Sequence, residues 1–241
     1  MNTSDPEFLS KLRKESEAAQ KQFIGNIAGR LGRSAVSPQP AHPFRGAPDF
    51  WTAYELGREE QIARFMSNWQ AAGGFAERAA AMTDLPGMIS RILGELNAAS
   101  TVRQNLPELE QLGLEALLPG LRHDAWNGLD ADASLRTAEK ADAGIVLADF
   151  AVAYTGSIVV TSSTEKGRSV SLLPNILIAV IPAERMHTRL GEVMSRIASV
   201  PGEQFPAGVH FISGPSRSSD IENDLTIGVH GPGVAYALIV G

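Results

Sequence analysis

The sequence predicts an α/β domain with a mostly parallel sheet flanked by helices, preceded by an N-terminal helical extension. Short apolar segments bounded by glycine alternate with amphipathic segments in the C-terminal half, as in folds built from strand–helix–strand units. Residues 176–181 form a continuous apolar run of strand length, which is typical of a strand buried on both faces. Hydrophobic residues make up 44% of the 241 residues, which is enough for one large core.

The N-terminal region predicts a helix over residues 5–32 followed by an arm. Phe8, Leu12 and Phe23 belong to a stripe with mostly four-residue spacing, which places them on one helical face. Residues 34–48 contain four prolines and show no periodicity, as expected for a linker or a surface arm. We therefore expect residues 1–50 to form a helix and a Pro-rich arm, and residues 51–241 to form the α/β domain.

Hydrophobic periodicity and glycine-containing turns place the remaining elements of the domain. The predicted helices cover residues 52–72, 85–99, 134–141 and 183–198. The predicted strands cover residues 75–82, 144–148, 158–161, 176–181, 209–212, 225–227 and 235–240. Residues 101–126 are ambiguous, with a short helix and turn within them.

Composition excludes several classes of function. The net charge is -6 and basic residues are interspersed with acids, so neither a nucleic acid nor an anionic membrane surface is an expected partner. The chain has no cysteine, so it cannot hold a disulfide, a thiolate nucleophile or a Cys-ligated iron–sulfur cluster. We expect no metal site either, because the histidines lack the paired spacing of zinc ligands; they are His42, His123, His187, His210 and His230.

The N-terminus is polar and charged, without the apolar segment of a signal peptide. Apolar runs stay well below the ~20 residues that a membrane span requires. We therefore expect a cytoplasmic protein without a membrane span.

The strongest candidate for a binding site is the segment 212–222. A Gly-Pro turn that includes Gly214 is followed by Ser216 and Arg217, and then by Asp220 and Glu222. If Ser218 or Ser219 caps a short helix, its free N–H groups and the Arg217 guanidinium can bind an anion. We expect this loop at the carboxyl end of a sheet strand, where ligands of open α/β sheets bind. The alternative is a capped helix with a solvated arginine.

A second candidate is the glycine-flanked His230, next to Gly231. Glycines let a ligand approach the backbone, and the imidazole could serve as an acid, a base or a donor. The alternative is a tight loop in which His230 bonds a backbone carbonyl.

Two further segments carry weaker signals. Asp149 precedes a Thr155-Gly156-Ser157 turn that could offer hydroxyl and N–H groups to an anion, and an Asx-type turn is the alternative. Arg168 follows Lys166-Gly167 in a basic turn that could clamp an anion, or could be a solvated hairpin tip.

Taken together, these motifs resemble the LUD domain, and most of all the lactate utilization protein C family. The resemblance covers about residues 140–241, in order and with matching spacing. It is carried by residues 144–151, 155–157, Arg168 with 171–174, 214–217 with 220–222, and 228–232.

The resemblance implies a fold like that of ribose-phosphate isomerases and CoA transferases. It also implies a part in oxidising L-lactate to pyruvate, alongside iron–sulfur partner proteins that hold the clusters. Since this chain lacks cysteine, it fits the cluster-free member of such a system. The resemblance assigns no catalytic residue.

Three functions therefore stay open, and with them whether the chain is an enzyme. The first is a cluster-free subunit or accessory protein of an L-lactate oxidation system, binding a small anion. The second is a stand-alone enzyme on a sugar phosphate or acyl-CoA, with Asp220, Glu222 or His230 as acid and base. The third is a structural subunit without a ligand, in which the apolar stripe of residues 5–32 forms a homo-oligomer or another packing contact.

Overall fold

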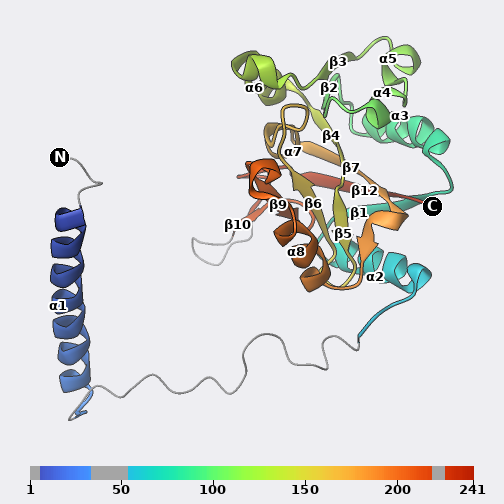
Figure 1. The fold of residues 1–241 in the computed structure, drawn as a ribbon. Coiled ribbons are helices and arrows are strands. Elements are labelled where there is room, and N and C mark those ends of the chain that lie inside the picture. Colours follow the sequence, from blue (N-terminus) through green and yellow to red (C-terminus); the bar gives the residue numbers. More distant parts are fainter. Residues whose placement is uncertain (1–5, 34–53, 219–225) are drawn as a thin grey trace. The chain divides into compact units, whose positions relative to one another are not determined.

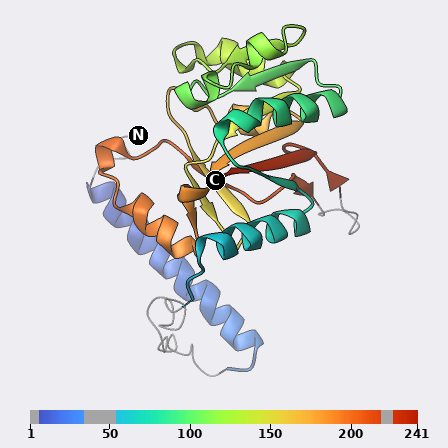
Figure 2. The same cartoon turned by 90° about the vertical axis from the view of Figure 1, so that its right-hand side faces the viewer.

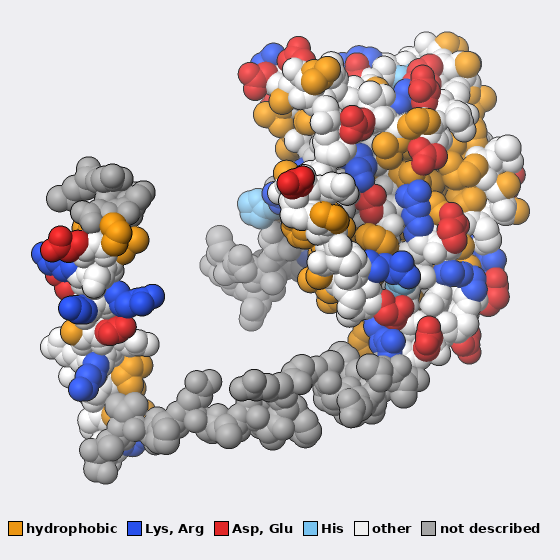
Figure 3. All heavy atoms as spheres, viewed as in Figure 1, with side chains coloured by type: hydrophobic (Ala, Val, Ile, Leu, Met, Phe, Trp, Pro, Cys, Tyr) orange, Lys and Arg blue, Asp and Glu red, His pale blue; other side chains and the backbone are white. Residues whose placement is uncertain are grey.

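The computed structural model describes residues 6–33, 54–218 and 226–241. The chain divides into two compact units, Met1–Trp51 and Thr52–Gly241, a division one residue from the predicted boundary. In the first unit the predicted helix is confirmed as α1 (Pro6–Arg30), which exposes most of its apolar side chains, as Figure 3 shows. The Pro-rich segment 34–48 lies outside the described residues.

A six-stranded sheet forms the centre of the second unit (Figure 1). Its strands are all parallel, which confirms the predicted sheet type. Their order across the sheet is β1 (Phe75–Ala79), β12 (Val234–Val240), β7 (Ile176–Pro182), β4 (Ala143–Leu147), β2 (Ser100–Arg103) and β3 (Arg122–Ala125).

Alternate side chains of the central strands enter two cores, one on each face of the sheet. Ile178 and Leu238 pack with the apolar residues of α3 (Leu85–Glu95) on one face. Ala179 and Ile239 pack on the other face with Phe65 and other residues of α2 (Arg58–Ala71). Figure 2 shows α3 and α2 on opposite sides of the sheet. Because both faces are covered, residues 176–181 are apolar without alternation.

A second sheet lies beside the parallel one. It contains β8 (Met186–His187), β5 (Phe150–Val152), β6 (Ser157–Thr161) and β9 (Val209–Ile212), in that order. The predicted strands at 158–161 and 209–212 exist, and they pair antiparallel with each other here. β6 also pairs antiparallel with β5, because the short turn before Ser157 permits only an antiparallel pair.

The predicted helix over residues 183–198 is wrong in its first half. A 3-10 turn (Ala183–Arg185) and β8 come first, and α8 (Leu190–Ala198) starts later. The N–H of Ala153 donates to the His187 carbonyl at 2.8 Å, so this segment extends β5. Long-range backbone pairing therefore overrides the helical periodicity, and His187 lies in a strand rather than in a helix.

The other expected helices are confirmed with different bounds. α2 and α3 are shorter than predicted, and α6 (Ala131–Lys140) starts three residues earlier. The ambiguous segment 101–126 contains α4 (Pro107–Glu110) and α5 (Leu114–Leu117). Sequence patterns missed β2, β3 and β5, which have four, four and three residues. Near the chain end, β10 (Arg217–Ser218) pairs antiparallel with β11 (Thr226–Ile227). No helix in the described ranges is long and apolar enough to cross a membrane.

Candidate functional site

An open cavity of about 510 Å³ lies where three loops meet beside β9. We call it the arginine cavity. Its lining residues are Arg168, Ser171, Leu172, Val209, His210, Phe211, Ile212, Ser213, Gly214, Ser216, Arg217, His230, Gly231 and Pro232. Six of the candidate residues predicted from sequence therefore come together here, namely Arg168, Gly214, Ser216, Arg217, His230 and Gly231.

The arginine cavity lies at the amino ends of the parallel strands, not at the carboxyl ends that the sequence suggested. The loop with His230 precedes β12, and α7 (Ser169–Leu172) precedes β7. The loop with Arg217 follows β9, which belongs to the second sheet. The expectation failed because it assigned this loop to a strand of the parallel sheet.

Backbone pairing holds the two C-terminal loops together. The Ser216 N–H donates to the Pro232 carbonyl at 2.8 Å, and the Gly228 N–H donates to the Ser216 carbonyl at 3.0 Å. Gly231 lies so close that a Cβ there would be 3.3 Å from Ser216 Cβ. Arg217 and Ser218 then form β10. Residues 219–225, where the predicted short helix with Asp220 and Glu222 falls, lie outside the described part of the chain.

Two glycines with left-handed backbone let Arg217 lie against the end of α2. Gly214 has φ 93°, and a Cβ there would be 3.1 Å from Ala72 Cβ. Gly73 has φ 90°, and the Arg217 guanidinium lies 2.8 Å from the position of a Cβ on it. A side chain at Gly73 would therefore occupy the space of the guanidinium.

Close packing also positions Arg168, which lines the arginine cavity just before α7. Gly167 lies against the Trp126 indole, and Gly144 lies against the Val170 carbonyl, with no room for a Cβ at either glycine. The turn before Arg168 is anchored rather than a solvated tip, because Lys166 Nζ donates to Asp149 Oδ1 at 2.7 Å and to Thr161 Oγ1 at 2.8 Å.

The charge of the arginine cavity is positive. Arg168 and Arg217 are both exposed side chains that line it. Among the described residues, neither guanidinium forms an ion pair or a side-chain hydrogen bond, and no Asp or Glu lines the cavity. Two unpaired guanidiniums can bind a carboxylate or phosphate with charge-assisted, bidentate hydrogen bonds.

His210 is a cavity residue that sequence reasoning treated as structural. Its Nε2 lies 2.9 Å from Ser162 Oγ. Burial, and after it the positive charge of Arg168, lowers the pKa of His210 below its ordinary value of 6.5. The imidazole is therefore neutral at neutral pH. The sequence offered one weak signal for it, the neighbouring Gly208, where a Cβ would be 2.7 Å from His210 Nε2.

Three described candidate residues, Asp149, Thr155 and Gly156, do not line the cavity. The Asp149 carboxylate accepts from Lys166, from the Thr161 N–H at 2.7 Å and from Thr161 Oγ1 at 2.8 Å, so its contacts hold the fold together. Gly156 has φ 60° and packs against Asn68 and Trp69 of α2.

Thr155 reaches the cavity only through other hydroxyls. Ser157 Oγ lies 2.8 Å from Thr155 Oγ1 and 2.7 Å from Ser213 Oγ, and Ser213 lines the cavity. This hydroxyl chain fixes the Ser213 side chain rather than offering Thr155 to a ligand.

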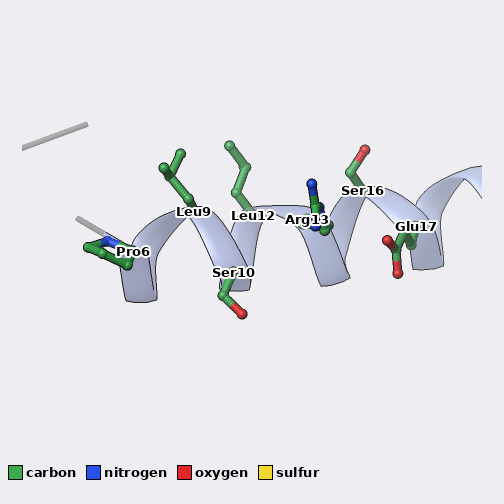
Figure 4. Close-up of a pocket in the computed structure, with 7 residues that line it drawn as sticks. All are labelled: Pro6, Leu9, Ser10, Leu12, Arg13, Ser16 and Glu17. Carbon is green, nitrogen blue, oxygen red and sulfur yellow. The ribbon is translucent and has the colours of Figure 1, made fainter. Parts of the chain in front are cut away.

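A second hollow runs along α1 in the first unit (Figure 4). Leu9 and Leu12 stand on the same side of the helix, and Ser10 points to the opposite side. Because this single helix supplies all of its walls, the hollow cannot enclose a ligand. Among the described residues of both units, no group of three or more His, Cys, Asp or Glu could hold a metal ion.

Comparisons with known proteins agree on one family. The model of the LUD domain matches residues 62–240. Lactate utilization protein C of Halalkalibacterium halodurans is 32% identical over 224 residues, covering 92% of this chain and 97% of its own length. Lactate utilization protein C of Bacillus subtilis is 35% identical over 229 residues, covering 92% and 95%.

A solved structure has the same fold. A DUF162 family protein from Deinococcus radiodurans, 22% identical, superimposes with a TM-score of 0.56 over 77% of this chain and 99% of its own. The match of the family model over most of the α/β unit, together with relatives above 30% identity along nearly the whole chain, shows that this protein belongs to the LUD domain family.

Proposed function

We propose that this chain takes part in lactate utilisation as a cluster-free subunit or accessory protein of an L-lactate oxidation system. The support is the likeness to lactate utilization protein C over nine-tenths of both chains. The chain has no cysteine and so holds no Cys-ligated cluster, which fits a member of the system that leaves electron transfer to other proteins. Iron–sulfur proteins of the same system are therefore the proposed partners.

The arginine cavity is the proposed ligand site, and the observation that carries this proposal is its two guanidiniums, Arg168 and Arg217, neither of which forms an ion pair with any described residue. Lactate and pyruvate each carry one carboxylate, and a carboxylate matches the donor pair of a guanidinium. Ser171 Oγ already donates to the Arg168 carbonyl, and Ser213 Oγ is hydrogen-bonded to Ser157 Oγ. Both hydroxyls line the cavity with acceptor lone pairs that a ligand hydroxyl can use. His230 borders the same space.

The role in the pathway is tested in cells. L-Lactate-dependent oxygen uptake is measured after deletion of the gene and after its restoration. We expect uptake to fall on deletion and to return with the gene. Uptake that does not change on deletion contradicts the pathway assignment.

The ligand site is tested on the purified full-length chain by calorimetric titration with pyruvate, L-lactate and phosphate. We expect Arg217→Ala to weaken carboxylate binding at least tenfold, because a charged hydrogen bond contributes about 1.5–3 kcal/mol. Arg136→Ala is the matched control, since Arg136 is an exposed arginine of α6 outside the cavity. Equal affinity in both variants removes Arg217 from the site. A strong preference for phosphate favours the alternative of an enzyme acting on phosphorylated sugars.

Self-association through α1 is a separate proposal. The exposed apolar side chains of α1 include Leu12, 51% exposed, and Phe23, 64% exposed. Sedimentation of the full chain, with Leu12→Glu as the variant, tests it. A larger species that is lost in Leu12→Glu supports the proposal, and a monomer in both chains contradicts it.

A further inference from the structure

His210 borders the arginine cavity with one ring nitrogen engaged and the other available. Nε2 lies 2.9 Å from Ser162 Oγ. Within the described residues, Nδ1 has no hydrogen-bond partner. A small polar ligand in the cavity can therefore supply a partner for the ring without displacing a bond within the protein.

The Ser162 contact is compatible with both charge states of the ring. A hydroxyl can donate to an unprotonated Nε2 and can accept from a protonated one. His210 can therefore gain a proton and keep this hydrogen bond. The residue is only partly buried, so solvent can deliver the proton.

The positive charge around His210 decreases when an anion binds. Arg168 faces it from the segment before α7, and Arg217 and His230 line the same cavity from the C-terminal loops. Ser162, the residue after β6, is neutral. No described carboxylate lines this space. Without ligand, the positive field opposes a charged imidazole. A bound carboxylate neutralises part of that field and favours the charged ring.

We propose that His210 contacts the oxygen on carbon 2 of a small carboxylic acid whose carboxylate is bound by Arg168 and Arg217. This inference rests on the proposed function and extends it to a ligand class, the 2-oxo and 2-hydroxy acids. A 2-oxo oxygen only accepts, so it pairs with an N–H on Nδ1, which is present in the protonated ring and in the neutral tautomer whose Nε2 accepts from Ser162. A 2-hydroxyl can accept from the same N–H, or can donate to Nδ1 of the other neutral tautomer.

The test is calorimetry of the full-length protein near pH 6.5, the ordinary pKa of histidine, in two buffers of different ionisation enthalpy. Pyruvate, L-lactate and propionate are the probes. We expect pyruvate and L-lactate to bind with uptake of a fraction of one proton, because a bound carboxylate favours the charged ring. Propionate, which lacks an oxygen on carbon 2, should bind most weakly. His210→Gln should abolish the proton uptake, and His187→Gln, the matched control outside the arginine cavity, should retain it.

The outcomes separate this inference from the proposed function. If pyruvate binds without proton uptake, or if the uptake persists in His210→Gln, the role of His210 is overturned while the carboxylate site stands. If the wild-type protein binds none of the three acids, the proposed site fails and this inference fails with it.

Histidine NMR of the wild-type protein provides a readout that does not depend on the variant's fold. The signal of His210 is assigned through its contact with Ser162. It should titrate with a higher pKa in the presence of pyruvate. An unchanged pKa at saturating pyruvate overturns the proposal.

Discussion

Lys166 Nζ lies 2.7 Å from Asp149 Oδ1, and this ion pair joins the end of β4 to the turn that precedes Arg168. The two side chains are 15% and 23% exposed, so water screens the pair only in part. The carboxylate also accepts two hydrogen bonds from Thr161. The sequence suggested separate anion sites around Asp149 and around Arg168. In the structure, this ion pair joins the two segments to each other.

Asp149→Ala should destabilise the fold by about 1–3 kcal/mol, because it leaves the Lys166 ammonium and the Thr161 N–H without their acceptor. Urea unfolding measures the change. Lys166→Met is the companion variant, and the double variant should lose less than the sum of the two single losses. A wild-type unfolding free energy in Asp149→Ala, combined with lost pyruvate affinity, would show that Asp149 serves the ligand instead.

Gly144→Ala should destabilise the protein by about 1–3 kcal/mol or more, because the added methyl overlaps the Val170 carbonyl and pushes α7 off β4. Gly94→Ala is the control. Gly94 lies in α3 with nothing within 4 Å of an added Cβ, so this change should be neutral or stabilise the helix by up to about 1 kcal/mol. Thermal unfolding compares them, and equal melting temperatures contradict the close contact at Gly144.

Gly73→Ala should weaken pyruvate binding, because the methyl displaces the Arg217 guanidinium. The φ of 90° adds backbone strain of about 1–2 kcal/mol. Gly113→Ala carries comparable backbone strain at φ 62°, has nothing within 4 Å of the added Cβ and lies outside the arginine cavity. Titration calorimetry and unfolding together should find reduced stability in both variants and reduced affinity only in Gly73→Ala. Equal affinity in the two variants would contradict the positioning of Arg217 by Gly73.

Acid should destabilise the fold through His187 and His210. Burial is the first cause that lowers the pKa of each below 6.5, followed by Arg196 for His187 and Arg168 for His210. The unfolded chain then binds more protons than the folded chain below about pH 6.5. Stability should therefore be complete above that pH and should fall as the pH drops through the lowered folded pKa values.

Urea unfolding between about pH 7.5 and about pH 5 measures this loss. His187→Gln should flatten the slope without affecting pyruvate affinity, since His187 contacts Phe150 and Glu192 rather than the arginine cavity. An unchanged slope in His187→Gln and His210→Gln would assign the acid sensitivity to other groups.

Apolar patterning and glycine placement were sufficient to predict the parallel sheet, α1 and the segments of the arginine cavity. These signals are local, because a strand buried on both faces must be apolar throughout, as β7 is. They missed β2 and β3, which are four residues each, too short for a periodic signal. They also extended a helix over Met186 and His187, where pairing with β5 decides the conformation.

By itself, the sequence determined the fold class, the absence of any cysteine-ligated cluster, and the polar loops from which a site could be built. The tertiary structure decided which of those loops meet. It brought Arg168, Arg217 and His210 to one cavity at the amino ends of the parallel strands, and it left Asp149 in an ion pair with Lys166. The physical reason is that the chain itself specifies each residue's chemistry and the local periodicity. The neighbours of a loop depend instead on strand order, which is set by pairing between distant segments.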